Sequence, residues 1–196
     1  MSHYECKECQ KPYQYCGCKQ EDKMNLIELQ NKIHEQNKEL GWWDDPRPFS
    51  TFVCLFHSEL SEAIEGDRKG LMDDHLPKHE MFWVELSDFA IRCMDWLGSK
   101  AGSGYDNLYF DDTDLNKFGR AGFVARLHSA ISECFSNEGN DDELIDGLSS
   151  CVDACFEYAK QNKIDLHQII IEKVEYNKHR ADHKRENRAK EGGKKY

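Results

Sequence analysis

The stretch "LPKHEMFWVELSDFAIRCMDWLG", residues 76–98, decides the fold of this chain. Its spacing predicts a helix that is apolar on nearly every side. The apolar positions are Phe82, Trp83, Leu86, Ala90, Cys93, Met94 and Leu97. One stripe differs, because Glu85, Asp88, Arg92 and Asp95 recur at steps of three and four residues and therefore share one face. A helix of this kind is buried, so its charged stripe needs partners inside the protein.

The preceding stretch "PFSTFVCLFHSELSEAIEGDRKG", residues 48–70, predicts a second helix that also carries acidic residues on its apolar face. Its apolar face consists of Phe52, Leu55, Phe56 and Ala63. Glu59 points the same way, and Glu62 lies one turn later at the edge of that face. Ser50 is the expected N-cap. A buried carboxylate without a partner is costly, so Glu59 also needs compensation.

Helical signals cover most of the remaining chain. We expect further helices over residues 22–43, 120–136, 141–161 and 164–188, and a Gly- and Asp-rich loop over residues 98–122. No alternating run of strand length competes with them, so we predict an all-α helical bundle that occupies residues 21–188 as one domain. No apolar run is long enough for a membrane span, and no N-terminal apolar segment indicates a secretory signal. A cytoplasmic location is therefore expected.

The N-terminus differs in kind from the helical body. The segment "CKECQKPYQYCGC" places four cysteines within thirteen residues, Cys6, Cys9, Cys16 and Cys18. Their C-x-x-C and C-x-C pairs can supply four thiolates to one tetrahedral zinc ion, so residues 1–20 are predicted to form a small zinc knuckle. A Cys-bearing disordered tail and redox chemistry are alternatives that the spacing leaves open. The other five cysteines, expected to be packing thiols, are Cys54, Cys93, Cys134, Cys151 and Cys155.

Charge is distributed unevenly along the chain. The formal net charge is −11 at pH 7, yet residues 173–196 hold nine Lys or Arg against four Asp or Glu, a net of +5, which leaves −16 on residues 1–172. The overall balance argues against nonspecific binding to nucleic acid. An acidic body with a basic end suits a site where cations bridge carboxylates to an anionic ligand. The simpler alternative is a soluble protein with a solvated tail, flexible over residues 189–196.

Two acid pairs define the candidate metal site. Glu59 and Glu62 on one helix, and Glu85 and Asp88 on the next, have the i, i+3 spacing that brings both carboxylates of a pair to one side. Two such helices side by side could gather all four around one cavity. Hard cations such as Mg²⁺, with Mn²⁺ as a substitute, prefer oxygen ligands of this kind. Salt bridges to neighbouring Arg and Lys side chains are the alternative. A di-iron site is disfavoured, because no Glu has a His three residues later.

These motifs resemble a known family. E-x-x-E at residues 59–62 and E-x-x-D at residues 85–88, with 22 residues between them, are similar to the paired motifs of the all-α nucleoside triphosphate pyrophosphohydrolases. This is the group of MazG, dimeric dUTPase and dCTP pyrophosphatase. The segment "KVEYNKHR", residues 173–180, is similar to the family's K-x-x-x-N-x-x-R segment.

Two aromatic residues extend the resemblance toward one branch. His34 and Trp43 resemble the base-contacting His and Trp of the dCTP pyrophosphatases. Trp42 is adjacent to Trp43, and the pattern does not choose which of the two stacks on a base. The resemblance covers residues 24–98 and 162–184, and residues 119–161 are an insertion.

The resemblance implies an enzyme that cleaves a nucleoside triphosphate between its α and β phosphates, which gives the monophosphate and pyrophosphate. Glu59, Glu62, Glu85 and Asp88 would hold Mg²⁺, and Glu59 would take the proton of the attacking water. Members of the family are dimers or tetramers, so a homodimer or homotetramer is expected.

The same resemblance implies roles for the substrate-binding residues. Lys173 and Arg180 would neutralise the outer phosphates, and Asn177 would bond to sugar or phosphate. His34 and Trp43 would recognise the base, with a pyrimidine deoxynucleotide such as dCTP as the first choice. Two other functions stay open: a non-catalytic nucleotide or metal sensor on this fold, and an adaptor whose zinc knuckle binds a partner while its helices are structural.

The cysteine spacing generates a prediction of its own. Elemental analysis of the purified chain should find about one zinc ion per molecule, because four thiolates complete one tetrahedral site. Deleting residues 1–20 should remove that zinc. If the shortened chain still retains it, other residues bind the metal and the zinc knuckle is wrong.

Overall fold

A computed structural model describes residues 18–100, 114–188 and 190. Every element in this part of the chain is helical, which confirms the all-α class. The elements are α1 (Cys18–Glu39), α2 (Phe49–Lys69), α3 (Met81–Gly98), η2 (Leu115–Phe118), α4 (Gly119–Ser136), α5 (Asp141–Gln161), α6 (Leu166–His179), η3 (Ala181–His183) and α7 (Arg185–Arg188). Of the helices it describes, none is long and apolar enough to cross a membrane.

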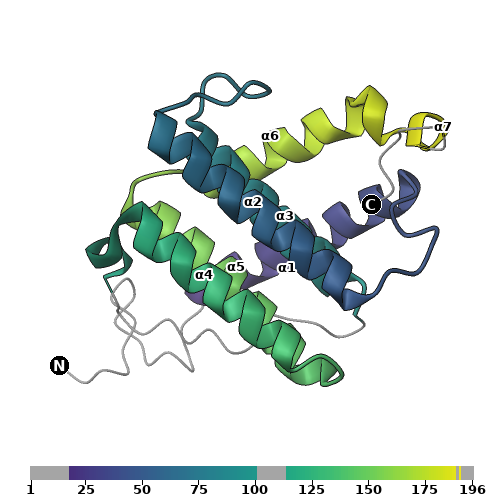
Figure 1. The fold of residues 1–196 in the computed structure, drawn as a ribbon, viewed down its shortest axis with the longest axis horizontal. Coiled ribbons are helices and arrows are strands. Elements are labelled where there is room, and N and C mark those ends of the chain that lie inside the picture. The colour runs from purple at the N-terminus through teal and green to yellow at the C-terminus, as the bar shows by residue number, and fades with distance from the viewer. Residues whose placement is uncertain (1–17, 101–113, 189, 191–196) are drawn as a thin grey trace.

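Helix α3 is the central element, as its sequence predicts. It packs against α1, α2, α5 and α6, and Figure 1 shows it alongside α2 in the middle of the molecule. Its fully buried apolar side chains are Phe82, Val84, Leu86, Phe89, Ala90, Cys93, Met94 and Leu97. Because neighbours lie on several sides, the charged stripe of α3 faces other helices rather than bulk water.

The structure corrects the start of both central helices. Helix α2 begins after Pro48, which is its N-cap, so Ser50 lies inside the first turn and caps nothing. Helix α3 begins at Met81 rather than near Leu76. The physical reason is Asp73, whose carboxylate accepts hydrogen bonds from the backbone N–H groups of His75 and Leu76 at 2.9 and 2.7 Å and so stabilises a turn there.

The end of the chain also departs from the expected single helix over residues 164–188. Helix α6 stops at His179, and Arg180 is extended, with φ −62° and ψ 129°. The residues that follow are polar and have no apolar face to bury. They turn back instead: Arg185 binds Asp44 at 2.7 Å, and the guanidinium of Arg188 lies 3.6 Å from the ring centroid of Trp42. Apart from Lys190, the tail at residues 189–196 lies outside the described residues.

The helices of the insertion belong to the same core. Helix α4 packs on α2 and α5, and α5 packs on α3. A Cβ added at Gly147 of α5 would lie 2.5 Å from Sγ of Cys134 in α4, which shows how closely the two helices approach. Four of the expected packing thiols are buried, Cys93, Cys134, Cys151 and Cys155, whereas Cys54 is exposed. Burial raises the pKa of Cys134 to about 11, so this thiol is held in its neutral form.

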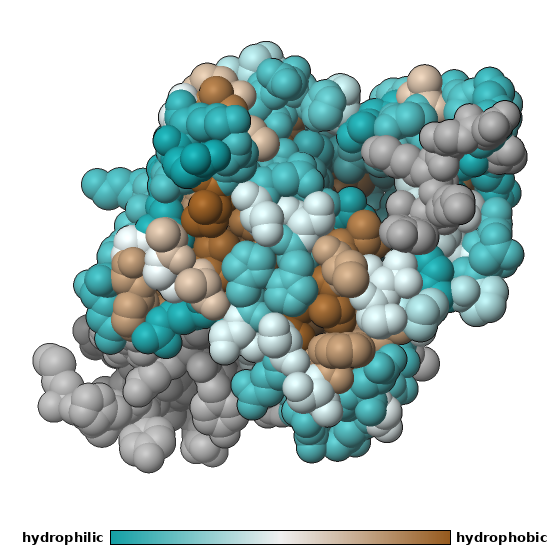
Figure 2. Space-filling model, in the orientation of Figure 1, coloured by the Kyte–Doolittle hydropathy of each residue, from teal (hydrophilic) through white to brown (hydrophobic). Residues whose placement is uncertain are grey.

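The surface is mostly polar. On the face shown in Figure 2, hydrophilic residues predominate and apolar side chains gather in narrow areas between the helices. The predicted zinc knuckle cannot be placed on this surface, because Cys6, Cys9 and Cys16 lie outside the described residues. Cys18 is the first residue of α1. The zinc site therefore stays a prediction.

Candidate metal centre

Three carboxylates meet between the two central helices. Glu59 from α2 and Glu85 and Asp88 from α3 each offer one oxygen, and these oxygens all lie within 4.8 Å of one another. Glu59 is 5% exposed and Glu85 is 7% exposed. The i, i+3 spacing on α3 and the packing of α2 against it therefore bring three of the four predicted ligands together.

Two basic side chains compensate part of this negative charge. Arg92, one turn along α3 from Asp88, donates from Nε to Oε1 of Glu59 at 2.5 Å. Lys173 of α6 is buried, and its Nζ lies 2.9 Å from Oδ2 of Asp88. Two cations face three carboxylates, so full ionisation would leave one uncompensated negative charge in a poorly solvated place.

The pKa values show where that excess charge is relieved. Burial raises the pKa of Glu85 most, and together with the charges of Asp88 and Glu59 it brings that pKa to about 9. Burial also raises the pKa of Glu59 and of Asp88, although Arg92 and Lys173 oppose the shifts. Glu85 therefore holds a proton at neutral pH. A divalent cation could take the place of that proton, and an all-oxygen donor set suits Mg²⁺ or Mn²⁺, so these residues fit the expected metal.

Glu62 is not part of this group of three. Its side chain is exposed and accepts a hydrogen bond from Oγ of Ser58 at 2.9 Å. It is nevertheless close enough for its charge to contribute to the raised pKa of Glu59, after burial and Asp88. Its place at the edge of the apolar face of α2 explains this position. The role of Glu62 as a metal ligand stays a prediction.

The charged stripe of α3 continues to the predicted base-contacting residues. Asp95 accepts hydrogen bonds from Nδ1 of His34 and from Nε1 of Trp43, both at 2.9 Å. The rings of His34 and Trp43 meet edge to face with centroids 4.9 Å apart. A Cβ added at Gly98 would lie 2.6 Å from Cβ of His34, so a glycine there lets α1 approach α3 closely. Sequence reasoning placed Asp95 on the stripe but missed its role as their common acceptor.

The structure also distinguishes the two adjacent tryptophans. Trp43 bonds to Asp95, and its ring stacks on Phe52 with centroids 5.4 Å apart. Trp42 instead meets the ring of His183 edge to face and lies under the guanidinium of Arg188. Trp43 is therefore the tryptophan that belongs to the stripe of α3.

Helix α6 brings the predicted phosphate-binding residues to the opposite end of the stripe. Lys173 is already paired with Asp88, rather than free for a ligand as expected. Oδ1 of Asn177 is buried, and no hydrogen-bond partner is found for it in the described part of the chain. Arg180 makes two bonds to Asp182, at 3.0 and 2.8 Å. Burial lowers the pKa of Arg180, but the bonds to Asp182 and, more weakly, the charge of Asp88 raise it on balance.

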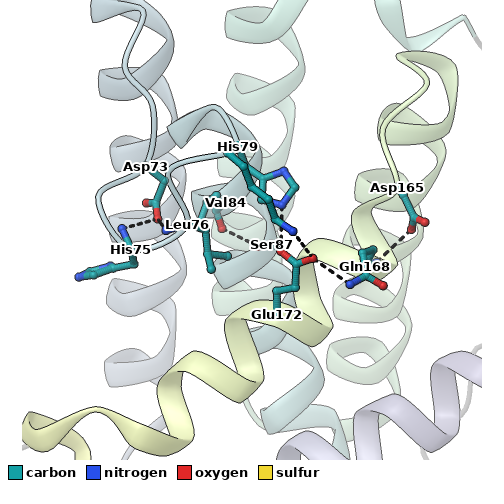
Figure 3. A network of polar contacts seen from close by, with 10 residues as sticks. Asp73, His75, Leu76, His79, Val84, Ser87, Asp165, Gln168 and Glu172 are labelled. Atoms are coloured by element: carbon teal, nitrogen blue, oxygen red, sulfur yellow. Dashed lines mark hydrogen bonds and ion pairs between the residues drawn. The ribbon is translucent and has the colours of Figure 1, made fainter.

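A polar network ties α6 to the loop between α2 and α3 (Figure 3). Glu172, which precedes Lys173, pairs with Lys78 at 2.8 Å and His79 at 3.0 Å and accepts from Gln168 at 2.8 Å. The bond from Lys78 is the main cause of the lowered pKa of Glu172, about 2. Nothing in the sequence pattern pointed to these residues. The loop between α2 and α3 is thus tied to α6 at the residue next to Lys173.

A separate cavity lies elsewhere in the molecule. Its volume is about 740 Å³, and it is lined by residues of η2, α4 and α5, among them Phe118, Leu127 and Cys151. It shares no residue with the carboxylate group. We therefore place the candidate site at the carboxylates, where charge and hydrogen-bonding groups converge, rather than in this cavity.

Comparison with known proteins identifies no relative. A scan against protein-family models, a search of curated proteins and a search of solved structures each returned no match.

The raised pKa of Glu85 predicts how stability depends on pH. In the folded chain Glu85 keeps its proton up to about pH 9, whereas in the unfolded chain it loses it near 4.5. The free energy of unfolding should therefore fall as pH rises between these values, by on the order of 1–3 kcal/mol between pH 5 and 7. Glu85→Gln removes this titration, so in EDTA its stability advantage over the wild type should grow with pH.

Denaturant unfolding in EDTA at several pH values measures this difference. Glu65→Gln is the matched control, because Glu65 lies on α2 with an exposed ion pair to Arg68 and Lys69 that lowers its pKa. It should show no advantage that grows from pH 5 to 9. Equal pH dependence in the wild type and Glu85→Gln would show that Glu85 is not protonated in the folded protein.

Proposed function

We propose that this chain is a Mg²⁺-dependent nucleoside triphosphate pyrophosphohydrolase, which converts a nucleoside triphosphate and water into the monophosphate and pyrophosphate. The observation that supports it best is the group of three carboxylates, the buried Glu59 and Glu85 and the partly buried Asp88, with oxygens within 4.8 Å of one another. Carboxylates so placed suit a cation that binds phosphate oxygens, and the family that the sequence resembles uses its acidic residues in this way. When bound there, Mg²⁺ would neutralise phosphate charge and acidify the attacking water.

Glu59 is the proposed proton acceptor. Its Oε1 accepts the 2.5 Å bond from Arg92, which fixes the orientation of the carboxylate. Burial raises its pKa, and a carboxylate with a raised pKa is a stronger base toward water. Glu59 also meets Glu85 and Asp88 within the group, so the proton would be taken up next to the proposed metal ligands.

Lys173 and Arg180 have different tasks in this proposal. Lys173 is buried against Asp88, so it would hold that carboxylate ionised and in place and would neutralise the outer phosphates from one side. Arg180 would exchange its bonds to Asp182 for the outer phosphates, which a guanidinium can bind through two parallel bonds. Oδ1 of Asn177 accepts only, so its partner would be a hydroxyl group of the sugar.

His34 and Trp43 are the proposed base-binding pair. Both are held by Asp95, so their orientation does not depend on the ligand. A carboxylate oxygen only accepts, so Nδ1 of His34 carries the proton toward Asp95 and Nε2 is the atom left to read a base. In its neutral form that atom accepts a hydrogen bond, which favours an amino group such as that of cytosine. Self-association into a dimer or tetramer is part of the proposal and is checked by light scattering at micromolar concentration.

The first test of this function is pyrophosphate release. With Mg²⁺ and a panel of ribo- and deoxynucleoside triphosphates, the wild type should release pyrophosphate and monophosphate in equal amounts. Glu59→Gln and Asp88→Asn should lower turnover by about 100-fold or more, because each removes a charged oxygen ligand or the base. Glu62→Gln decides the open role of that residue, and Glu65→Gln should leave turnover unchanged. Near-normal activity in both Glu59→Gln and Asp88→Asn would show that the site is elsewhere. Binding without turnover in the wild type would instead support a sensor.

The second test concerns the base. His34→Ala should reduce the preference for dCTP over other nucleotides more than it reduces the maximal rate, because it removes the group proposed to read the base edge. Trp43→Ala should weaken binding of every nucleotide by a similar factor, since stacking on an aromatic ring discriminates little and is worth about 1–3 kcal/mol. KM and kcat for dCTP, dUTP and dATP measure both effects. A wild type equally active on purines and pyrimidines would rule out the dCTP assignment.

A further inference from the structure

Arg47, in the connection between α1 and α2, forms no salt bridge with an acidic residue in the part of the chain that the structure describes. Its guanidinium lies 4.3 Å from the ring centroid of Phe52 and 5.3 Å from that of Trp43. Its Nε is buried, and no acceptor for it exists among the residues that the structure describes. Arg92, Arg120 and Arg180 are also partly buried, and each pairs with a carboxylate. A buried donor without an acceptor is unfavourable unless a ligand supplies one.

Charges of both signs surround Arg47. Burial lowers the pKa of its guanidinium most, the charge of Asp95 raises it, and the charges of Arg188 and Arg92 lower it. Nε of Arg188 is also buried without a partner in the described part of the chain. Arg47 lies over the ring of Trp43 and Arg188 over the ring of the adjacent Trp42, and Asp95 is already occupied by His34 and Trp43. An anion between them would relieve the repulsion and give the unpaired donors an acceptor.

The order of groups along α3 indicates which part of a ligand this anion belongs to. Asp95, with His34 and Trp43, marks one end of the stripe, and Glu85 marks the other. Arg92 lies between them and bonds to Glu59. Lys173 pairs with Asp88 toward one end, whereas Arg47 lies over Trp43, which bonds to Asp95 at the other end. A ligand lying along this stripe would meet Arg47 near its nucleoside end.

We propose that Arg47 binds a phosphate group on the nucleoside side of the cleaved bond, with Arg188 as the second donor. That the phosphate is part of a nucleotide rests on the proposed function, whereas anion binding at Arg47 does not. A guanidinium offers parallel N–H donors that match two phosphate oxygens. The guanidinium of Arg47 lies over the rings of Phe52 and Trp43, and these contacts hold it in place. After cleavage Arg47 would still contact the monophosphate, whereas the group bound by Arg180 would leave as pyrophosphate.

Equilibrium binding to the full-length chain tests this assignment without turnover. Titration calorimetry is carried out with dCMP, deoxycytidine, pyrophosphate and inorganic phosphate. Arg47→Ala should weaken binding of dCMP and of inorganic phosphate about tenfold or more, and should change the affinities for deoxycytidine and pyrophosphate by less than about twofold. Arg47→Lys keeps the charge but loses the paired donors, so its affinity for dCMP should fall between those of the wild type and Arg47→Ala. Arg180→Ala should have the opposite effect: it should weaken binding of pyrophosphate more than binding of dCMP.

The matched control is Arg126→Ala. The guanidinium of Arg126 also lies over a phenylalanine ring, 3.7 Å from that of Phe118, but in α4 away from the stripe. This variant should bind all four ligands as the wild type does. The unfolding temperature of each variant shows that it is folded. The inference is overturned if Arg47→Ala binds dCMP normally, if it loses deoxycytidine as strongly as dCMP, or if the wild type binds neither dCMP nor inorganic phosphate. If the wild type releases no pyrophosphate from any triphosphate, the proposed function is refuted. If Arg47→Ala in that case still loses binding of inorganic phosphate, the anion site stands.

Discussion

The burial of charged groups along one face of α3 is the constraint on which the rest of this structure depends. A helix that packs on several neighbours cannot cheaply leave carboxylates unpartnered, because burial of an isolated charge costs several kcal/mol. Each group is therefore met by another element. Asp88 meets Lys173 from α6, Arg92 meets Glu59 from α2, and Asp95 meets His34 from α1. The polar contacts of α3 thus fix three helices around it.

This arrangement links stability to the candidate function. The acidic group has fewer cations than carboxylates, so the folded protein compensates by raising the pKa of Glu85 to about 9. A divalent cation that binds this acidic group would stabilise the folded protein, because a ligand that binds only the folded state favours that state. At the other end of the stripe the buried Nε of Arg47 has no hydrogen-bond partner among the described residues. Carboxylates short of a cation and an arginine short of an acceptor suit a ligand that combines a cation and an anion, as a metal-bound nucleotide does.

The helices between η2 and α6 support this site without contributing to it. Helix α5 covers α3 on the side away from the charged stripe with buried apolar residues and thiols, and α4 covers α2. Tight contacts such as Gly147 against Cys134 leave little freedom between these helices. Their packing keeps α2 and α3 at a fixed separation, and the positions of Glu59, Glu85 and Asp88 relative to one another depend on that separation.

Local sequence determined which segments are helical and which face of α3 is charged, because periodicity and end signals act over a few residues. The bounds of α4 and α5 were predicted to within a residue, and the acid pairs were identified. Tertiary structure alone decided the rest. It left Glu62 exposed, buried Lys173 against Asp88 and hydrogen-bonded Trp43, rather than Trp42, to Asp95. These outcomes depend on which helices meet and at what distance, and no pattern within one segment contains that information.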